Sequence, residues 1–284
     1  MSLRTDIALR LVKRSFDKRF RYARLTRLPV MGKAMERAFF GGDDIIILPK
    51  EDVFMKRAVR TIEIDVPVRP ENIMLPSQVI DHFIDRSQYI FLMDKCLCRD
   101  ANHCHHYPSD IGCIFLGRGA ARMPSKMGRM VGKEEAKEHM RKGRELGLVN
   151  LIGRDKIDSV VFATGPSSDL LSICSCCPCC CLWKMVPDLS PAIADTITRM
   201  PGLEIKVDLD RCKGCGQCIE GRFCYVGAIG MVEGKARVDG GLCKGCARCV
   251  ELCKHEAIQL MIVDPHFLEA MVKRIGPLVD VECK

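Results

Sequence analysis

Eight cysteines between residues 212 and 253 are spaced for iron–sulfur chemistry. They form two runs, Cys212, Cys215 and Cys218 followed by Cys224, and Cys243, Cys246 and Cys249 followed by Cys253. A Cys-x2-Cys-x2-Cys turn directs three thiolates into one small cavity, and a more distant fourth cysteine completes the ligand set of a cubane cluster. Because such clusters move single electrons, the spacing favours a redox function.

Other uses of these eight cysteines fit the pattern less well. Structural zinc sites favour Cys-x2-Cys pairs, often with histidine, and gain nothing from a third cysteine two residues further on. A disulfide framework is typical of a short secreted chain, whereas this chain has 284 residues. Haem attachment needs Cys-x-x-Cys-His, but Cys249 and Cys253 are too far apart and His255 is misplaced. The sequence also contains no nucleotide or flavin motif, and Gly117 and Gly119 are predicted to be turn residues.

The two runs are an internal repeat, and the region resembles the bacterial two-cluster ferredoxin domain over about residues 205–263. Ala228-Ile229 and Ala257-Ile258 follow the last cysteine of each run at the same distance, which predicts two similar halves joined by a hairpin around Gly234. The resemblance implies that the last cysteine of each run serves the other cluster. The implied ligands are Cys212, Cys215, Cys218 and Cys253 for cluster 1, and Cys243, Cys246, Cys249 and Cys224 for cluster 2.

Two features of this region depart from the ferredoxin pattern. Five residues, 219–223, separate Cys218 from Cys224 where the family usually has three. Tyr225 and Lys254 replace the proline that normally follows the last cysteine of each run. We expect the insertion to bulge one cluster loop and to change the solvent exposure and potential of that cluster.

A third set of four cysteines lies nearer the N-terminus. Its members are Cys96, Cys98, Cys104 and Cys113. Residues 89–94 read as a strand, and alternation in an extended continuation would place Cys96 and Cys98 on one face, as two ligands of one metal require. His103, His105 and His106 flank Cys104; at least two of them are expected in a polar loop, while one could act as a ligand or proton donor.

Six more cysteines fall within eight residues, at Cys174, Cys176, Cys177, Cys179, Cys180 and Cys181. Core packing would use one or two such small residues, and adjacent cysteines do not readily form low-strain disulfides with each other. Metal or cluster ligation is the natural interpretation. A single extended strand would point Cys174, Cys176 and Cys180 to one side and Cys177, Cys179 and Cys181 to the other, so the segment could serve two clusters or one enlarged cluster.

The elements that must position these cysteines are visible in part. Residues 44–49 read as a short strand or connector, and Ile62, Ile64 and Val66 alternate with acidic residues as in a half-buried strand. A helix is predicted from Pro76, with Val79, Ile80, Phe83 and Ile84 on one face. A second helix is predicted over 133–146, because acidic residues are enriched at its start, basic residues at its end, and Gly147 follows. Hydrophobic stretches follow at 148–152 and 160–163.

The resemblance to known proteins extends beyond the ferredoxin region. Six segments are similar to a family of 4Fe-4S binding proteins from anaerobic archaea and bacteria. They are Asn72-Ile-Met-Leu-Pro-Ser, Cys96-Leu-Cys98-Arg-Asp, Asp110-Ile-Gly-Cys113-Ile-Phe-Leu-Gly, Lys133-Glu-Glu-Ala, Glu145-Leu-Gly-Leu-Val-Asn-Leu-Ile-Gly153 and Cys176-Cys-Pro-Cys-Cys-Cys-Leu-Trp183. The likeness covers roughly residues 70–260. It implies iron–sulfur cofactors, with one or two clusters beyond the ferredoxin pair, but no defined substrate.

Positive charge is concentrated at the N-terminus. Residues 1–40 hold 11 Lys or Arg against three acidic residues, which equals the net charge of +8 for the whole chain. Leu9, Val12, Phe16, Phe20 and Ala23 recur at helical spacing between basic residues that include Arg19. This arm could pack on its own domain with solvated arginines outside, dock an acidic partner protein, or lie on anionic lipid. Nucleic acid is the least favoured partner, since no basic patch exists beyond the arm.

Length and composition predict a soluble α+β protein with a mixed α/β central module and a small C-terminal two-cluster ferredoxin-like domain. The expected divisions are a basic arm over 1–44, a cysteine-rich central module over 45–204, the ferredoxin domain over 205–263 and a C-terminal helix or tail over 264–284. No signal peptide or transmembrane stretch is seen in the sequence. Reduced, clustered cysteines indicate the cytoplasm, and exposed clusters indicate an anaerobic one.

Three functions follow from these patterns. The favoured one is electron transfer between redox partner proteins, through the ferredoxin clusters and a central metal or iron–sulfur module. The alternative is an iron–sulfur reductase in which the ferredoxin domain feeds a catalytic centre built by the ten central cysteines, with His105 or His106 supplying protons. A zinc-bound interaction module with the ferredoxin as redox sensor is the third. No catalytic residue can be named from the sequence.

Overall fold

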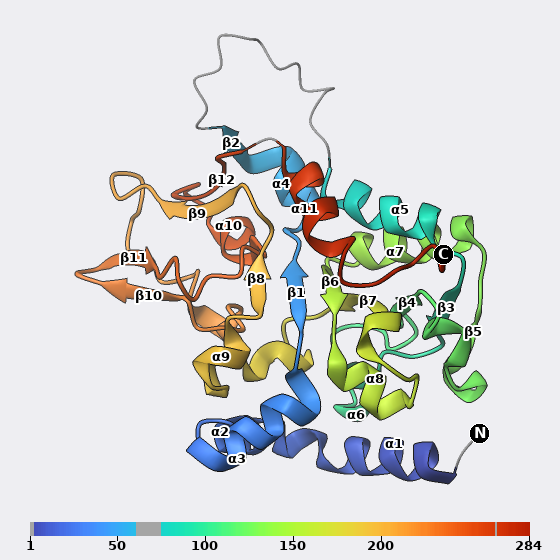
Figure 1. Ribbon diagram of the computed structural model, residues 1–284. Helices are drawn as coiled ribbons and strands as arrows, with labels where there is room; N and C mark the ends of the chain where they lie inside the picture. Colours follow the sequence, from blue (N-terminus) through green and yellow to red (C-terminus); the bar gives the residue numbers. More distant parts are fainter. Residues whose placement is uncertain (1–2, 61–74, 265) are drawn as a thin grey trace.

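A seven-stranded mixed sheet forms the centre of the fold in this computed structural model, which describes residues 3–60, 75–264 and 266–284 (Figure 1). In spatial order the strands are β5 (Gly128–Met130), β3 (Ile90–Met93), β4 (Ile114–Leu116), β7 (Leu171–Cys176), β6 (Val149–Arg154), β1 (Asp44–Ile47) and β8 (Ile197–Arg199). Neighbouring strands are antiparallel except β1 and β8, which are parallel. Together with the helices, this sheet confirms the α+β class.

Side chains alternate between the two faces of the sheet, and each face has its own cover. Ile46 and Ile152 pack under one layer of helices, while Ile45 and Ile47 pack on the opposite face. The first layer consists of α5 (Pro76–Arg86), α7 (Lys133–Glu145) and α11 (Phe267–Ile275). The second consists of α1 (Leu3–Ser15), α2 (Arg19–Leu25) and α8 (Lys156–Phe162). Shorter helices are α3 (Pro29–Met35), α4 (Glu51–Arg57) and α9 (Pro191–Ala194).

Both predicted helices are confirmed. α5 begins at Pro76 and buries the face that carries Val79 and Phe83, and α7 ends at Glu145, close to Gly147. The stretch 44–49 contains strand β1. The strand predicted around Ile62, Ile64 and Val66 lies outside the described residues.

The C-terminal cysteine runs are framed by two small sheets. β12 (Ile258–Ile262) lies between β9 (Leu203–Val207) and β2 (Ala58–Arg60), so a strand from before residue 61 joins the C-terminal region. β10 (Ile229–Val232) and β11 (Lys235–Val238) form the hairpin expected around Gly234 (Figure 1). Its turn residues, Glu233 and Gly234, have φ values of 50° and 74°, the geometry of a tight two-residue hairpin turn.

The N-terminal arm packs on the body of its own chain. Leu9 and Ala23 are buried against the sheet face that carries β1 and β3 and against α8, and Phe16 is buried as well. The arginine at 19 is an exception to the expected solvated face, since only 8% of it is exposed. Within the described part of the chain, no helix has the length and apolarity to cross a membrane.

Candidate metal centres

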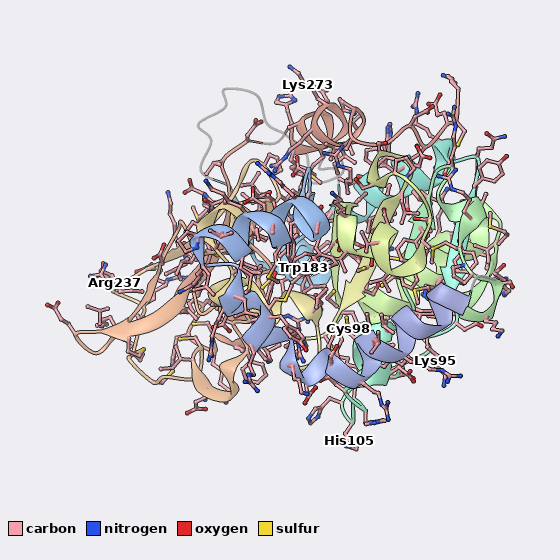
Figure 2. The ribbon with its side chains drawn as sticks, turned by 60° about the horizontal axis from the view of Figure 1, so that its bottom comes forward. Lys95, Cys98, His105, Trp183, Arg237 and Lys273 are labelled. Carbon is pink, nitrogen blue, oxygen red and sulfur yellow. The ribbon has the colours of Figure 1, made fainter. Side chains whose placement is uncertain are left out.

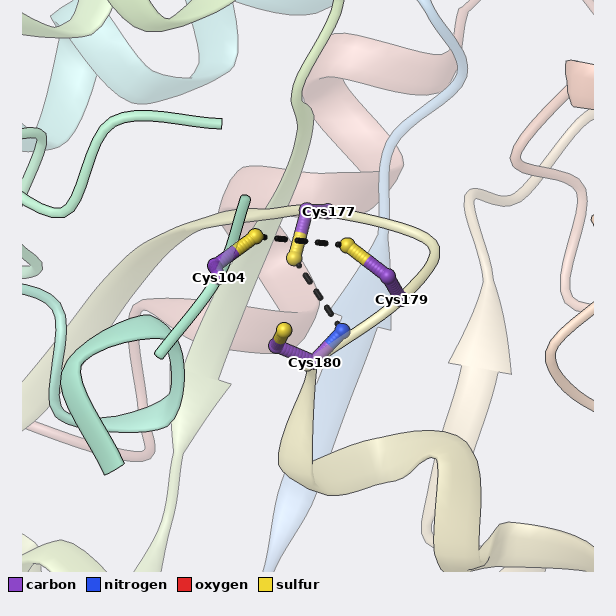
Figure 3. Close-up of side chains that lie close together, drawn as sticks. All are labelled: Cys104, Cys177, Cys179 and Cys180. Carbon is purple, nitrogen blue, oxygen red and sulfur yellow. Dashed lines mark hydrogen bonds between the residues drawn. The ribbon is translucent and has the colours of Figure 1, made fainter. Parts of the chain in front are cut away.

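Four cysteines from two separate segments form the most compact thiol group. Cys104 lies in the loop after helix α6 (Leu97–Ala101), and Cys177, Cys179 and Cys180 lie in the turn after β7 (Figure 3). Their Sγ atoms all lie within 4.8 Å of one another, and those of Cys104 and Cys179 are 3.5 Å apart. This group, called the tetrad here, could hold a metal ion.

The other six central cysteines form a second group beside the tetrad. This group, called the hexad here, consists of Cys96, Cys98, Cys113, Cys174, Cys176 and Cys181. The Sγ atoms of Cys113 and Cys174 are 2.9 Å apart, which is too long for a disulfide bond of about 2.05 Å. Cys96 also lies within hydrogen-bonding reach of Cys98 and Cys113, and Cys176 lies within reach of Cys181.

The expected third set of four cysteines is wrong in two respects. Cys104 separates from its three sequence neighbours and joins the tetrad. The segment that carries Cys96 and Cys98 is not extended, because α6 begins at Leu97 and the Asp100 N–H donates to the Cys96 carbonyl over 2.9 Å. A helical turn, rather than strand alternation, therefore brings Cys96 and Cys98 to one site.

The single extended strand expected over 174–181 is also wrong. β7 ends at Cys176, and the chain then turns through Pro178, which has no N–H to continue a strand ladder. Cys174 and Cys176 share a face as expected, but the turn places Cys180 with Cys177 and returns Cys181 to Cys176. Pro178 was the available signal, since proline is rarely found within a central strand.

The histidines near Cys104 lie outside both thiol groups. His103, His105 and His106 are all exposed, and Figure 2 shows His105 projecting from the molecule while Cys98 and Trp183 lie beneath the N-terminal helices. The compact thiol group includes no histidine. This agrees with the expectation of a polar loop for these side chains.

Three buried arginines surround the thiols and were not identified from the sequence. Arg19, Arg99 and Arg248 are 8%, 1% and 6% exposed. Each has an Nε atom without a hydrogen-bond partner among the described residues, and no ion pair to a carboxylate is found for any of them there. Such a charge is costly to bury without an anion nearby.

The thiols are the groups that can supply this negative charge. Arg99 lies beside Cys96, Cys113 and Cys176, and the charge of these sulfurs in their ionised form holds its pKa above the ordinary value although burial alone would lower it. Its guanidinium also donates to the carbonyls of Ser175, over 2.7 Å, and Ile111. The buried cations therefore fit thiolates or an anionic thiolate–metal centre, and neutral thiols would leave them uncompensated.

Six thiols in this arrangement do not all ionise on their own. Hydrogen bonds to neighbouring sulfurs, together with burial, hold the pKa of Cys98, Cys113 and Cys176 well above its ordinary value. The bonds from Cys113 and Cys98 lower the pKa of Cys96 instead. A bound cation removes this conflict because ligation deprotonates a thiol outright. The donor set of the hexad therefore fits metals that prefer thiolate ligands, such as iron in iron–sulfur clusters or zinc.

The structure also brings together each predicted C-terminal ligand set. The first C-terminal set consists of Cys212, Cys215, Cys218 and Cys253. These four cysteines line one hollow together with Ala257 and Ile258. The second C-terminal set consists of Cys224, Cys243, Cys246 and Cys249. Burial is the largest cause that raises the pKa of Cys249 well above its ordinary value, and the charges of the other three cysteines, which lie close by, add to the rise. Backbone N–H groups of Ala236 and Ala228 donate to the sulfurs of Cys212 and Cys224 over 3.4 and 3.2 Å. Such N–H···S bonds tune cluster potentials, although ligation itself stays a prediction.

Tyr225 and Arg248 connect the second C-terminal set to the hexad. Cys224, Cys243 and Cys246 pack in the same apolar cluster as Cys174, Cys176 and Cys181. The Arg248 guanidinium donates to the Cys176 carbonyl over 2.7 Å and lies in the field of Cys246 and Cys181. The Tyr225 hydroxyl is buried beside Cys246, Cys181 and Cys176 and has no partner among the described residues.

A cavity of about 410 Å³ opens beside the hexad. All six of its cysteines line the cavity, and the opposite wall comes mainly from the N-terminal arm, including Phe16, Arg19 and Ala23. Asp155 and Asp158 lie at its edge; burial raises the pKa of Asp155 well above its usual range and that of Asp158 to about 6. The volume is in the range of small-molecule sites.

Comparisons with protein-family models, curated proteins and solved structures found no match.

Proposed function

We propose that the protein transfers low-potential single electrons between redox partner proteins in the cytoplasm of an anaerobic cell. The observation that carries this proposal is the shared apolar cluster of the second C-terminal set and the hexad, with the Tyr225 hydroxyl and the Arg248 side chain buried beside both groups. Iron–sulfur clusters, when bound, supply one-electron chemistry. Because cysteines of both groups pack in one apolar cluster, they support electron transfer between two centres within one chain.

The surrounding residues have defined tasks in this proposal. The first C-terminal set is the more accessible end, because Cys215 is exposed, whereas Cys176 and Cys181 lie beneath the N-terminal arm. Arg248 supplies positive charge to both buried groups. Backbone N–H groups of Ala236 and Ala228 donate to the Cys212 and Cys224 sulfurs, as bonds that tune an iron–sulfur cluster do. Electrons would therefore enter near Cys215 and move toward the hexad.

Metal analysis of the anaerobically purified chain tests this proposal. With about four irons per cubane, the two C-terminal sets predict about 8 irons and 8 sulfides, and a hexad centre raises both counts. Redox-titrated EPR should show at least two interacting C-terminal clusters and a further centre. Iron without labile sulfide, or a signal of the first C-terminal cluster that persists in a variant with Cys212, Cys215 and Cys218 all replaced by serine, would contradict it.

A reductase is the second candidate, and the cavity beside the hexad is the observation that favours it. A pure electron carrier has no need of a small-molecule cavity against its buried thiols, whereas a reductase does. Asp155 and Asp158, with raised pKa values, could hold protons beside Cys174. Arg19 supplies positive charge to the same chamber.

Carbon monoxide is a suitable probe for this second function, because it binds only metal with an open coordination position. The reduced protein should give a new infrared band and a changed EPR signal from the central centre. Ala23→Phe, which fills the cavity wall, should weaken that response, while Lys273→Gln on the far side of the sheet should not. No response in the wild-type protein would leave electron transfer as the function.

A further inference from the structure

The tetrad differs from the C-terminal sets in how closely its sulfurs approach. A tetrahedral ion with zinc–sulfur bonds of about 2.3 Å holds its four sulfurs about 3.8 Å apart. The tetrad has all its Sγ atoms within 4.8 Å of one another, with one pair at 3.5 Å. Its dimensions therefore match four ligands around one ion.

A cubane cluster needs a wider arrangement. Its four thiolates bind four different irons at the corners of a cube, so they lie farther apart than ligands of a single ion. The two C-terminal sets have the cubane motif, yet among the described residues neither meets the 4.8 Å condition that the tetrad meets. Within the same chain, the Sγ atoms of the tetrad therefore lie closer together than those of the sets with the cubane motif.

We propose that the tetrad binds a single zinc ion as a closed structural site, separate from the iron–sulfur centres. Four thiolates fill the coordination of tetrahedral zinc and leave no open position, as in structural rather than catalytic sites. The exposed histidines at 103, 105 and 106 are therefore not needed as ligands.

Backbone N–H groups around the tetrad support its thiolates. The Cys180 N–H donates to the Cys177 sulfur over 3.3 Å (Figure 3). The backbone N–H groups of His106 and Tyr107 also lie near the Cys104 sulfur. Such bonds offset the negative charge of a four-thiolate site and orient its ligands.

The location of the tetrad gives the ion a structural task. It ties the loop after α6, through Cys104, to the turn after β7, through Cys177, Cys179 and Cys180. The elements that lead into these two segments, α6 and β7, carry Cys98 and Cys176 of the hexad. A single ion here therefore fixes the relative position of two hexad ligands.

The test is zinc, iron and sulfide content of the full-length protein, produced in iron-replete cells and purified anaerobically. We expect one zinc per chain, and X-ray absorption at the zinc edge should give four sulfur neighbours at about 2.3 Å with no second metal nearby. Cys104→Ser should lower the zinc content to well below one per chain while the C-terminal EPR signals remain. Cys215→Ser, in the exposed first C-terminal set, is the matched control and should change iron but not zinc.

The outcomes separate this site from the proposed function. Loss of about four irons and four sulfides with Cys104→Ser, or one iron in place of zinc, would overturn the zinc site even if electron transfer holds. One zinc per chain with few irons would support the site and count against electron transfer. If Cys104→Ser does not fold, replacement of zinc by Co²⁺ in the wild-type chain should give the visible absorption of a four-thiolate tetrahedral site. Absence of that absorption would contradict the proposal.

Discussion

Arg99 is a buried residue that lies beside thiols of both central groups. It is almost fully buried, donates to the carbonyls of Ser175 and Ile111, and faces thiols of both groups, including Cys176 and Cys177. Its positive charge and its two donors are separable contributions. If the charge supports metal binding and the donors support the fold, substitutions of Arg99 should change metal content and stability to different extents.

We predict that Arg99→Met lowers the free energy of unfolding by about 3 kcal/mol or more, because two buried carbonyls lose their donor and the thiols lose their cation. Urea denaturation with metal analysis of the same samples measures this. Arg99→Lys keeps the charge and should retain more metal than Arg99→Met, although both lose stability. Equal metal loss in the two variants would contradict a role for the charge.

Asp43 provides a prediction on pH dependence. It is buried, with its Oδ1 accepting the Lys156 N–H over 2.8 Å and its Oδ2 without a partner among the described residues. Burial raises its pKa to about 7 from the ordinary 3.8, against the Lys156 hydrogen bond, and neighbouring Asp158 adds to the rise while Arg154 opposes it. The folded protein therefore binds this proton more tightly than the unfolded chain.

The stability that this proton gives is fully present below pH 4 and is lost as the pH rises to about 7. Asp43→Asn cannot ionise, so its stability relative to the wild-type protein should improve between pH 5 and pH 8, by an amount on the order of 2 kcal/mol. Thermal or urea unfolding of both proteins at several pH values measures the difference. A constant difference across this range would show that Asp43 titrates normally.

At the scale of the elements, close backbone approaches place the hexad cysteines. Gly112 precedes Cys113 and runs against the end of β3, where an added Cβ would lie 2.1 Å from the Met93 carbonyl oxygen. The Cys113 carbonyl accepts the Met93 N–H over 3.0 Å, so β3 and the cysteine segment are joined at this point. Backbone atoms cannot yield as a flexible side chain does, and a side chain here must displace the segment.

Gly112→Ala should therefore move Cys113 away from Cys174 and remove metal from the hexad, with a loss of about 2 kcal/mol or more in stability. Iron content and EPR of the central centre are the measurements, and the C-terminal signals should remain. Gly132→Ala is the matched control, since a Cβ at Gly132 has no neighbour within 4 Å. Normal central metal in the Gly112→Ala protein would show that Cys113 is dispensable.

Local patterns predicted those elements whose cause is local. The Pro76 helix start, the charge distribution over 133–146 and the hairpin turn at Gly234 depend on nearby residues, and all three are present. The division of the ten central cysteines was not predictable in this way. It depends on contacts between Cys104 and Cys177, 73 positions apart, and on the turn at Pro178, where a continuous strand is predicted from alternation. The buried arginines were missed because sequence alone does not separate a buried arginine from a solvated one.

At the scale of the whole molecule, the thiol groups follow one another across the fold. The second C-terminal set meets the hexad at Tyr225 and Arg248, and the hexad adjoins the tetrad at Arg99. The N-terminal arm closes the hexad side, with Lys13 paired to Asp100 of α6 over 2.6 Å. A change of charge at a residue between two thiol groups should therefore change the reduction potentials of the centres in both groups.

Arg248 gives the sharpest test of that arrangement. Its positive charge favours the reduced, more negative form of any centre nearby, so Arg248→Gln should lower the reduction potentials of the second C-terminal centre and the hexad centre together. A loss of about 1.4 kcal/mol corresponds to about 60 mV for one electron, and shifts of that order are expected in redox-titrated EPR. The first C-terminal centre should not shift, Arg248→Lys should largely restore both potentials, and Arg237→Gln on the exposed hairpin should change none. A shift confined to one centre would mean that Arg248 does not join the two, and the path between them would have to run elsewhere.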